Sequence, residues 1–305
     1  MNAKSGSDPF LRNCPYCHSE HVKTSHRYQT QNNGERTIYL CQDCGSSYSE
    51  TYGTPIAGLT TPLSEIIKVL KARMEGMGLN ATTRVFGLAK NTILNWERRL
   101  SSRQETLFLY CLVHEFLQLV VQGDELYTKV KQNKEASQSE GWTIVLRERA
   151  SRFIWTLKCG RKERRLFLEA VGTLAELFDQ SEALALFTDG ERRYSQLLFD
   201  IGHDVFRSGK RGRPSKVLPK GIVVRLKNKS SQRRDSEGKL TKVETPKPEH
   251  PETSFSPQER VLDIFWMVHN FVRPHFTTRT IPAVAMGILE KGLTWEDLLQ
   301  LRILC

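Results

Sequence analysis

The sequence predicts a multidomain α/β protein, and three patterns support this fold class. Near the N-terminus, two Cys-x-x-Cys pairs flank a stretch of strand-like alternation around a turn. Residues 63–100 then show helical periodicity interrupted by glycines. From residue 122 onward, strand-like runs surround one amphipathic helix in the order βββαβ. A chain of 305 residues has room for about two domains by the usual length scale.

The composition is that of a globular protein with a basic excess. Hydrophobic residues make up 39% and charged residues 26%, which excludes disordered, collagen-like and membrane-spanning classes. The chain has 45 Lys and Arg against 34 Asp and Glu, a net charge of +11. Residues 207–247 contain 14 of the basic residues and only three acids, so this basic segment carries the whole excess. It predicts a polyanionic partner, either nucleic acid or an anionic membrane surface.

Membrane association is not expected. The first nine residues lack the apolar core of a signal peptide. The most apolar stretch, residues 107–121, contains His114 and Glu115 and does not form a bilayer span. Nucleic acid is therefore the favoured partner. Seven cysteines without an export signal predict a reducing, cytoplasmic location, at the nucleoid if the partner is DNA.

Four cysteines predict a structural zinc site. Cys14, Cys17, Cys41 and Cys44 follow the pattern C-x2-C-x23-C-x2-C. Two such thiolate pairs complete the tetrahedron that zinc prefers. Expected strands at 26–30 and 36–40, around an Asn-Asn-Gly turn, predict a zinc ribbon over residues 10–50. The alternative is two redox-active or coincidental Cys-x-x-Cys pairs.

The other cysteines and the nearby histidines are not expected to bind the ion. Four thiolates already fill a zinc coordination shell. The histidines close to the cysteines are therefore interpreted as solvated or DNA-facing side chains; they are His18, His21 and His26. The isolated cysteines are interpreted as ordinary apolar residues; they are Cys111, Cys159 and Cys305.

Residues 62–101 predict a helix-turn-helix unit, after a Gly/Pro/Thr linker at 51–61. Its helices are expected to begin at Leu63, at Asn80 as N-cap, and at Lys90, with a turn at Gly87 between the last two. The polar face of the third helix offers groups that read base edges or hold phosphates: Lys90, Asn91, Thr92, Asn95, Arg98 and Arg99. The alternative is a plain three-helix bundle with a solvated polar face.

A connecting helix is expected over residues 102–121. Residues 107–121 are almost entirely apolar, which is typical of a buried core helix. A spacer between domains and a dimer face are the alternative interpretations.

Two aspartates flank the predicted strands of the C-terminal half. Strands are expected at 125–130, 142–148, 153–159 and 183–187, with a helix at 161–180. Asp124 precedes the first strand and Asp189 follows the fourth. If these strands are neighbours, the two carboxylates come together and can hold divalent cations for phosphodiester chemistry. The alternative is that each is an ordinary turn residue.

The chain resembles DDE transposases of the insertion sequence one type, with their two reading frames fused. The resemblance covers nearly the whole chain, in order. It rests on the cysteine pairs, the helix at 90–100, Gly123-Asp124-Glu125-Leu126-Tyr127, Phe187-Thr188-Asp189-Gly190, Val223-Val224-Arg225-Leu226-Lys227-Asn228-Lys229, His269-Asn270-Phe271-Val272-Arg273 and His275-Phe276-Thr277-Thr278.

The resemblance implies an RNase H-like DDE domain over residues 122–305 that cuts DNA at element ends and joins it to a target. Asp124 and Asp189 would be its first two catalytic carboxylates, with Mg²⁺ or Mn²⁺ as cofactor. The partners implied are DNA, as element ends and target, and further copies of the chain in a homo-oligomer.

The sequence departs from this family at the third carboxylate. The family carries a glutamate on a helix after the basic strand, followed by an arginine-rich run. Here residues 246–254, rich in proline, lead almost directly to 256–261, so that helix is missing. Glu259 is the best substitute. The alternative role for Glu259 is capping its own helix, through the pattern Ser256-Pro257-Gln258-Glu259.

The composition of the basic segment predicts an arm that binds DNA. Arg211 and Arg213 are expected to track a minor groove or phosphates, and Arg225, Lys227 and Lys229 to face DNA from a strand.

These patterns are compatible with three functions. The first is a metal-dependent transposase. The second is a transposase-derived binding protein or repressor that does not cut. The third is a zinc-ribbon nucleic-acid protein whose C-terminal half is structural.

Overall fold

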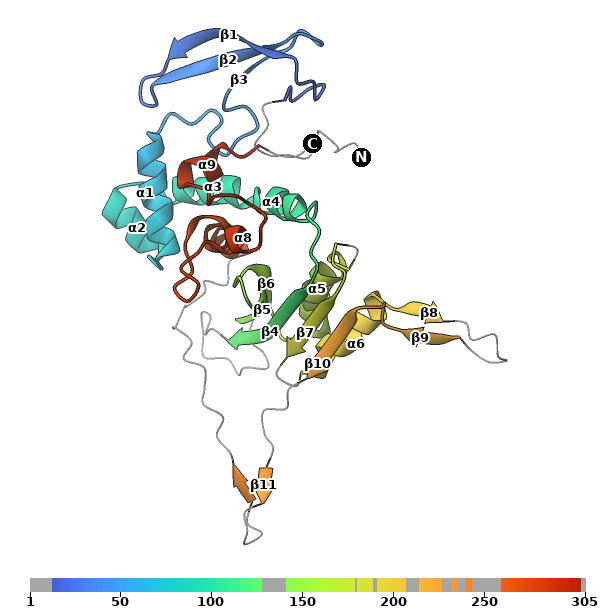
Figure 1. Ribbon diagram of the computed structural model, residues 1–305. Helices are drawn as coiled ribbons and strands as arrows, with labels where there is room; N and C mark the ends of the chain where they lie inside the picture. Colours follow the sequence, from blue (N-terminus) through green and yellow to red (C-terminus); the bar gives the residue numbers. More distant parts are fainter. Residues whose placement is uncertain are drawn as a thin grey trace. The chain divides into compact units, whose positions relative to one another are not determined.

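The computed structural model of the protein describes residues 13–127, 141–178, 180–188, 191–206, 214–226, 232–234, 240–242 and 259–302. The chain divides into two units (Figure 1). The first comprises Met1–Val113 with Asp263–Cys305, and the second comprises His114–Leu262. This division differs from the expected C-terminal domain of 122–305, because the last 43 residues belong with the N-terminal unit.

The N-terminal part of the first unit is a small antiparallel sheet, named here the cysteine ribbon (residues 13–50). Its strands are β1 (Val22–Gln29), β2 (Glu35–Cys41) and β3 (Ser47–Ser49), in that order. Gly34 adopts a positive φ of 71° in the hairpin turn, as the Asn-Asn-Gly sequence predicts. The ribbon buries a small core of Cys14, Tyr39, Cys41 and Tyr48. Both predicted strands are confirmed.

Residues 51–61 connect the ribbon to α1 without a helix or strand, as predicted for a linker, and they are packed against neighbouring residues. Thr54 and Ile56 are buried. The side chains of Asn32 and Asn33 donate to the carbonyl oxygens of Thr60 and Thr61 at 2.8 and 3.1 Å. These bonds tie the turn of the ribbon to the start of the helices, which composition alone does not reveal.

Four helices follow: α1 (Leu63–Met74), α2 (Leu79–Phe86), α3 (Lys90–Ser101) and α4 (Gln104–Cys111). Helix α2 begins at Leu79 with Gly78 as N-cap, so Asn80 is not the cap. Gly87, with φ of 67°, ends α2 and makes the turn into α3, as expected.

The predicted long helix at 107–121 was wrong, because α4 ends at Cys111 and strand β4 (Leu119–Tyr127) begins at Leu119. Leu119 and Val121 are buried in the middle of a sheet. The apolar run of residues 107–121 spans the end of α4, the connection after it and the start of β4, and periodicity does not reveal where one element ends and the next begins.

Helix α7 (Glu259–Met267) crosses the boundary between the units at Asp263. The C-terminal part of the first unit then contains the π-helical turn η2 (Val268–Val272), α8 (Pro282–Ala285) and α9 (Trp295–Gln300). Helix α9 contacts α1 and begins with a capping box between Thr294 and Asp297. Arg302 then donates to the carbonyl oxygens of Asn13 and Glu50, at 3.3 and 3.2 Å. The chain end thus returns to the cysteine ribbon.

Within the described residues, the second unit contains a five-stranded sheet in the order β10-β7-β4-β5-β6 (Figure 1). After β4 come β5 (Trp142–Glu148), β6 (Ile154–Gly160), α5 (Arg164–Ala175), β7 (Leu184–Thr188), α6 (Arg192–Ile201) and β10 (Ile222–Leu226). Strands β4, β5 and β6 pair antiparallel, whereas β7 runs parallel to β4 and β10 runs parallel to β7. The predicted order βββαβ is confirmed, and the first and fourth strands are neighbours.

Two short hairpins lie in or beside the basic segment. Strand β8 (Asp204–Phe206) pairs with β9 (Ser215–Val217), and β11 (Gln232–Arg234) pairs with β12 (Leu240–Lys242). In the part of the chain that is described, no helix is long and apolar enough to cross a membrane.

Gly123 sits where β4 is packed most tightly. A Cβ atom there would lie 3.0 Å from Leu146 Cδ2 and 3.2 Å from Thr188 Cγ2, with the buried ring of Tyr194 behind them. Leu146 and Thr188 are themselves buried, so they have little room to yield. The absence of a side chain at Gly123 therefore allows β5, β7 and α6 to close around β4.

Replacing this glycine is expected to destabilise the sheet. Gly123→Ala should lower the free energy of unfolding by about 1–3 kcal/mol through overpacking, measured by urea denaturation. Gly172 in α5 provides the matched control, because a Cβ there meets nothing within 4 Å. Gly172→Ala should raise stability by about 0.5–1 kcal/mol, as expected in a helix interior. Equal effects of the two substitutions would contradict the packing argument.

A buried ion pair joins α1 to α3. Arg73 Nε lies 2.6 Å from Glu97 Oε1, and the two side chains are 7% and 0% exposed. The Arg73 guanidinium also donates to the carbonyl oxygen of Met77, at the end of α1. Sequence analysis missed this pair, because its partners are 24 residues apart and Glu97 lies on the buried face of α3 with Ile93 and Trp96.

Removing one partner of this pair should be costly. Glu97→Ala is expected to lower the free energy of unfolding by about 3–5 kcal/mol, because it leaves a buried guanidinium uncompensated. The double replacement Arg73→Met with Glu97→Leu should recover much of that loss. Thermal and denaturant unfolding of the wild type and the two variants measures the difference. A double variant as unstable as Glu97→Ala would show that the unpaired charge is not the cause.

Candidate metal centre and nucleic-acid interface

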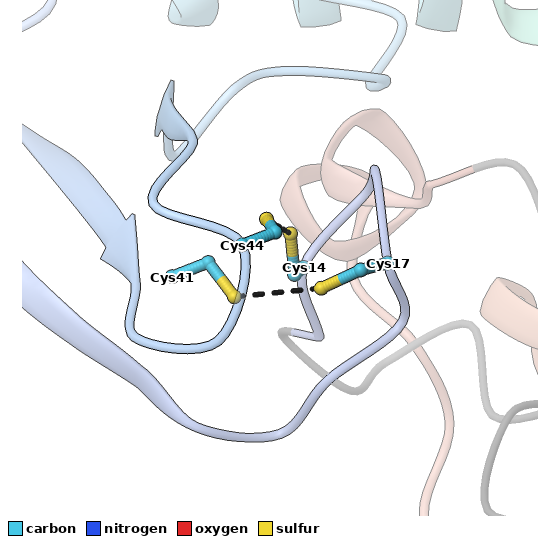
Figure 2. A group of neighbouring side chains, drawn as sticks. All are labelled: Cys14, Cys17, Cys41 and Cys44. Atoms are coloured by element: carbon cyan, nitrogen blue, oxygen red, sulfur yellow. Dashed lines mark hydrogen bonds between the residues drawn. The ribbon is translucent and has the colours of Figure 1, made fainter.

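The four predicted cysteine ligands come together in the cysteine ribbon. Figure 2 shows their side chains converging from two loops. The sulfur atoms all lie within 4.8 Å of one another, with Cys14 to Cys44 at 3.6 Å and Cys17 to Cys41 at 3.5 Å. Tetrahedral zinc with bonds of about 2.3 Å requires sulfur separations of about 3.8 Å. The cluster can therefore hold a metal ion such as zinc.

The two cysteine loops have the same backbone geometry. The amide of Cys14 donates to the Ser19 carbonyl, and the amide of Cys41 donates to the Ser46 carbonyl five residues on. The residue after each second cysteine, His18 or Gly45, donates to the first cysteine of its pair and has a positive φ of 59° or 72°. Two equivalent loops present four thiols in a fixed arrangement, as a closed structural site requires.

Neighbouring polar groups support this centre without joining it. Hydrogen bonds from the Ser46 side chain and then its backbone lower the pKa of Cys44 to about 6, which favours the thiolate at neutral pH. His21 Nδ1 lies 3.3 Å from Asp43 Oδ1, and Ser19 also contacts Asp43. His26 is exposed on β1. Among the described residues, the metal-binding group consists of the four cysteines alone, as expected.

Helix α3 places the predicted DNA-binding residues on its outer side, with one difference. Lys90, Asn91 and Arg98 are exposed, and Thr92 and Asn95 are half-buried. Asn91, Asn95 and Arg98 follow helical spacing and share one face. Arg99 instead donates to the carbonyl oxygens of Pro55 and Ala57, at 3.4 and 2.7 Å, so it holds the packed segment 51–61 in place.

Asp124 lies inside strand β4 and not before it, which corrects the expected position. It pairs with Val145 of β5, and its Oδ1 accepts a hydrogen bond from its neighbour Glu125 N at 2.9 Å. On the other side, parallel pairing with β7 runs from Leu119 with Leu184 to Gln122 with Phe187. Gly123 then meets Thr188, the last residue of β7.

The remaining predicted site residues are described in part or not at all. Asp189 follows Thr188 in the chain and lies outside the described residues, as do Arg211, Arg213, Lys227 and Lys229. Glu259 is the first residue of α7, and the structure does not describe its side chain. Arg225 is exposed on β10, with its guanidinium 5.7 Å from the ring of Phe187 on β7.

Charged residues that sequence analysis missed lie close to these strands. Glu125 pairs with Lys162 at 3.2 Å, and the Lys162 ammonium stands 4.2 Å from the Trp142 ring centroid. Glu191 caps α6 and takes two hydrogen bonds from the Arg193 guanidinium, at 2.9 and 2.7 Å. These bonds lower the pKa of Glu191 to about 2. The position of Glu191 directly before an amphipathic helix could have predicted its capping role.

Loss of one cysteine should empty the metal centre. Cys44→Ser is the variant of choice, because Cys44 is exposed and its replacement leaves little cavity. Purified wild-type protein is expected to contain one zinc per chain by mass spectrometry, and Cys44→Ser to contain none and lose the ribbon fold. Cys159→Ser, outside the cluster, should keep its zinc. A fully loaded Cys44→Ser protein would refute the four-thiolate site.

Comparisons with protein-family models and with curated proteins found no match to this chain.

Proposed function

We propose that this protein is a DDE-type DNA transposase, which binds element ends and catalyses metal-dependent DNA cleavage and strand transfer. In this proposal the sheet of the second unit is an RNase H-like domain and Asp124 and Asp189 are its metal ligands. The helices α2 and α3 form a helix-turn-helix, and the cysteine ribbon holds structural zinc.

The observation that carries the proposal is the parallel pairing of β4 with β7. Their register matches Gln122 with Phe187, and Gly123 packs against Thr188. Asp124 and Asp189 are the next residues of the two segments. Residues at equivalent positions of adjacent parallel strands lie about 5 Å apart, a separation that carboxylates sharing divalent cations require. The register therefore supports a shared site for the two carboxylates.

Carboxylates at this position suit Mg²⁺ or Mn²⁺. Both are hard cations that prefer oxygen ligands, and Asp124 is half-buried with its carboxylate oriented by Glu125 N. Two such ions, when bound, activate a water or a 3′-hydroxyl and stabilise the leaving oxygen. Glu125 pairs with Lys162, and Glu191 pairs with Arg193. We assign Asp124 and Asp189 to the metal because the register of β4 with β7 gives them matching positions.

DNA binding is supported by a different set of residues. The face of α3 with Asn91, Asn95 and Arg98 combines amide groups that suit adenine with a guanidinium that suits guanine. In the second unit, β10 extends the sheet beside β7 and turns Arg225 outward. Arg225, on the strand next to β7, would hold a phosphate near the proposed metal site.

A second function, DNA binding without cutting, is favoured by one feature of the sequence. The sequence between the basic segment and α7 has glutamates only among prolines and no arginine run, so the third carboxylate depends on Glu259. Two aspartates alone would hold two ions weakly, and small misplacements of reacting groups reduce rates steeply. A transposase-derived repressor would need only the α3 face and the basic segment.

Replacing Asp124 should separate the two functions. Wild-type protein is incubated with labelled duplexes from the DNA that flanks its coding sequence, in Mg²⁺ or Mn²⁺, and nicking and joining are measured on gels. Asp124→Asn and Asp189→Asn should each lower the cleavage rate by about a hundredfold or more, because the ions lose a charged ligand. Binding in Ca²⁺ should persist in both.

Asp204→Asn is the matched control, because Asp204 is an exposed aspartate in the same unit on β8. Its cleavage rate should equal that of the wild type. Glu259→Gln tests the third position: a loss similar to Asp124→Asn assigns Glu259 to the metal, and no change assigns it to capping. Salt-sensitive binding with no cleavage by the wild type would favour the repressor. Cleavage retained in Asp124→Asn would overturn the catalytic assignment.

A further inference from the structure

The loop after η2 presents an exposed aromatic side chain on a rigid support. Phe276 is 75% exposed. Its loop is closed by hydrogen bonds from His275 N to the Thr280 carbonyl at 3.0 Å and from Arg279 N to the His275 carbonyl at 2.7 Å. Arg279 adopts a positive φ of 55°, a conformation that non-glycine residues seldom take. The loop therefore holds Phe276 in water at a cost in free energy.

Behind Phe276 stands a series of three aromatic rings. Its ring stacks on His275 at 4.9 Å between centroids, with an interplanar angle of 28°. His275 meets His269 edge to face at 5.7 Å, and His269 stacks on Phe265 of α7 at 5.8 Å. The π-helical turn η2 carries His269 in this series. We name these four rings the aromatic stack.

The imidazole of His275 is held in one orientation. Its Nδ1 accepts a hydrogen bond from Thr277 N at 3.2 Å, which orients the plane of the ring. One face of Phe276 is therefore covered by a fixed flat ring. The exposed remainder of the Phe276 ring is available to stack against a flat ligand.

The charges around Phe276 favour an anionic partner. Residues 273–289 contain two arginines and no acid. Arg273 pairs with Glu75 of the same unit, and Arg279 and Thr277 are exposed. Thr277 and Arg279 follow Phe276 in the same hydrogen-bonded loop. A hydroxyl and a guanidinium in one loop with an exposed ring fit a nucleotide, whose base stacks while its phosphate takes the hydrogen bonds.

We propose that Phe276 and the aromatic stack form a platform for an unpaired DNA base, with Arg279 and Thr277 holding its phosphate. A paired base within a duplex has both faces covered by its neighbours, so the platform selects a base that is displaced or single-stranded. This inference rests on the DNA binding proposed above and adds to it a preference for unpaired bases.

The test uses a duplex that carries one unpaired 2-aminopurine and a fully paired duplex of the same length. The full-length protein should bind the first more tightly and quench 2-aminopurine fluorescence. Phe276→Ala should weaken binding of the unpaired site about tenfold and abolish quenching, with binding of the paired duplex unchanged. Phe276→Trp, which keeps an aromatic ring, should retain both the affinity for the unpaired site and the quenching. Leu117→Ala is the control, because Leu117 is 78% exposed in the other unit.

The outcomes separate this proposal from the proposed function. If the wild type binds neither duplex, DNA binding itself fails. If it binds both and Phe276→Ala leaves affinity and quenching unchanged, the platform is refuted. A change in oligomer mass for Phe276→Ala by light scattering, with quenching unaltered, would assign the exposed ring to a second copy of the chain and overturn the proposal.

Discussion

The pairing of β4 on both of its sides is the constraint on which the second unit depends. One edge of β4 takes β5 antiparallel and the other takes β7 parallel, so β4 is the centre of the sheet. Its buried residues Leu119 and Val121 fill the middle, and Gly123 lets Leu146 and Thr188 approach within contact distance. A side chain at Gly123 would separate the strand of Asp124 from the strand that leads to Asp189. Packing at Gly123 thus controls how closely the two segments of the candidate site approach each other.

Local spacing made the cysteine ribbon predictable, because its ligands and turn are defined within short segments. The two loops around Cys14 and Cys41 share one hydrogen-bonding pattern, and the Asn-Asn-Gly turn lies where the sequence predicts. The sheet order was also predictable in outline from its alternating runs. The start of β4 was not predictable, because the apolar run that contains it also covers the end of α4, and periodicity does not separate the two elements. The register with β7, which defines the candidate site, follows only from three-dimensional packing.

Contacts between distant segments were beyond the reach of sequence patterns. Arg99 looked like a DNA-binding residue because it follows Arg98 on α3, yet it donates to carbonyl oxygens of Pro55 and Ala57. Arg302 lies above the ring of Tyr48 at 5.4 Å and also donates to backbone of the ribbon. The identity of a charged residue does not reveal whether its side chain lies in water or donates to backbone carbonyl oxygens. Only their neighbours in the fold distinguish a structural arginine from one that is available to a ligand.

The position of β10 changes how the charge of the protein is interpreted. The composition of the basic segment predicts an arm, but its residues 222–226 form a strand of the same sheet, paired with β7 from Ile222 with Leu184 to Leu226 with Thr188. Arg225 therefore has a fixed place opposite Phe187, two residues before Asp189 in the chain. A cation held by backbone pairing loses less freedom on binding a phosphate than one on a free arm. The sheet thereby places Arg225, which we propose binds DNA, beside the strand that leads to Asp189, the proposed metal ligand.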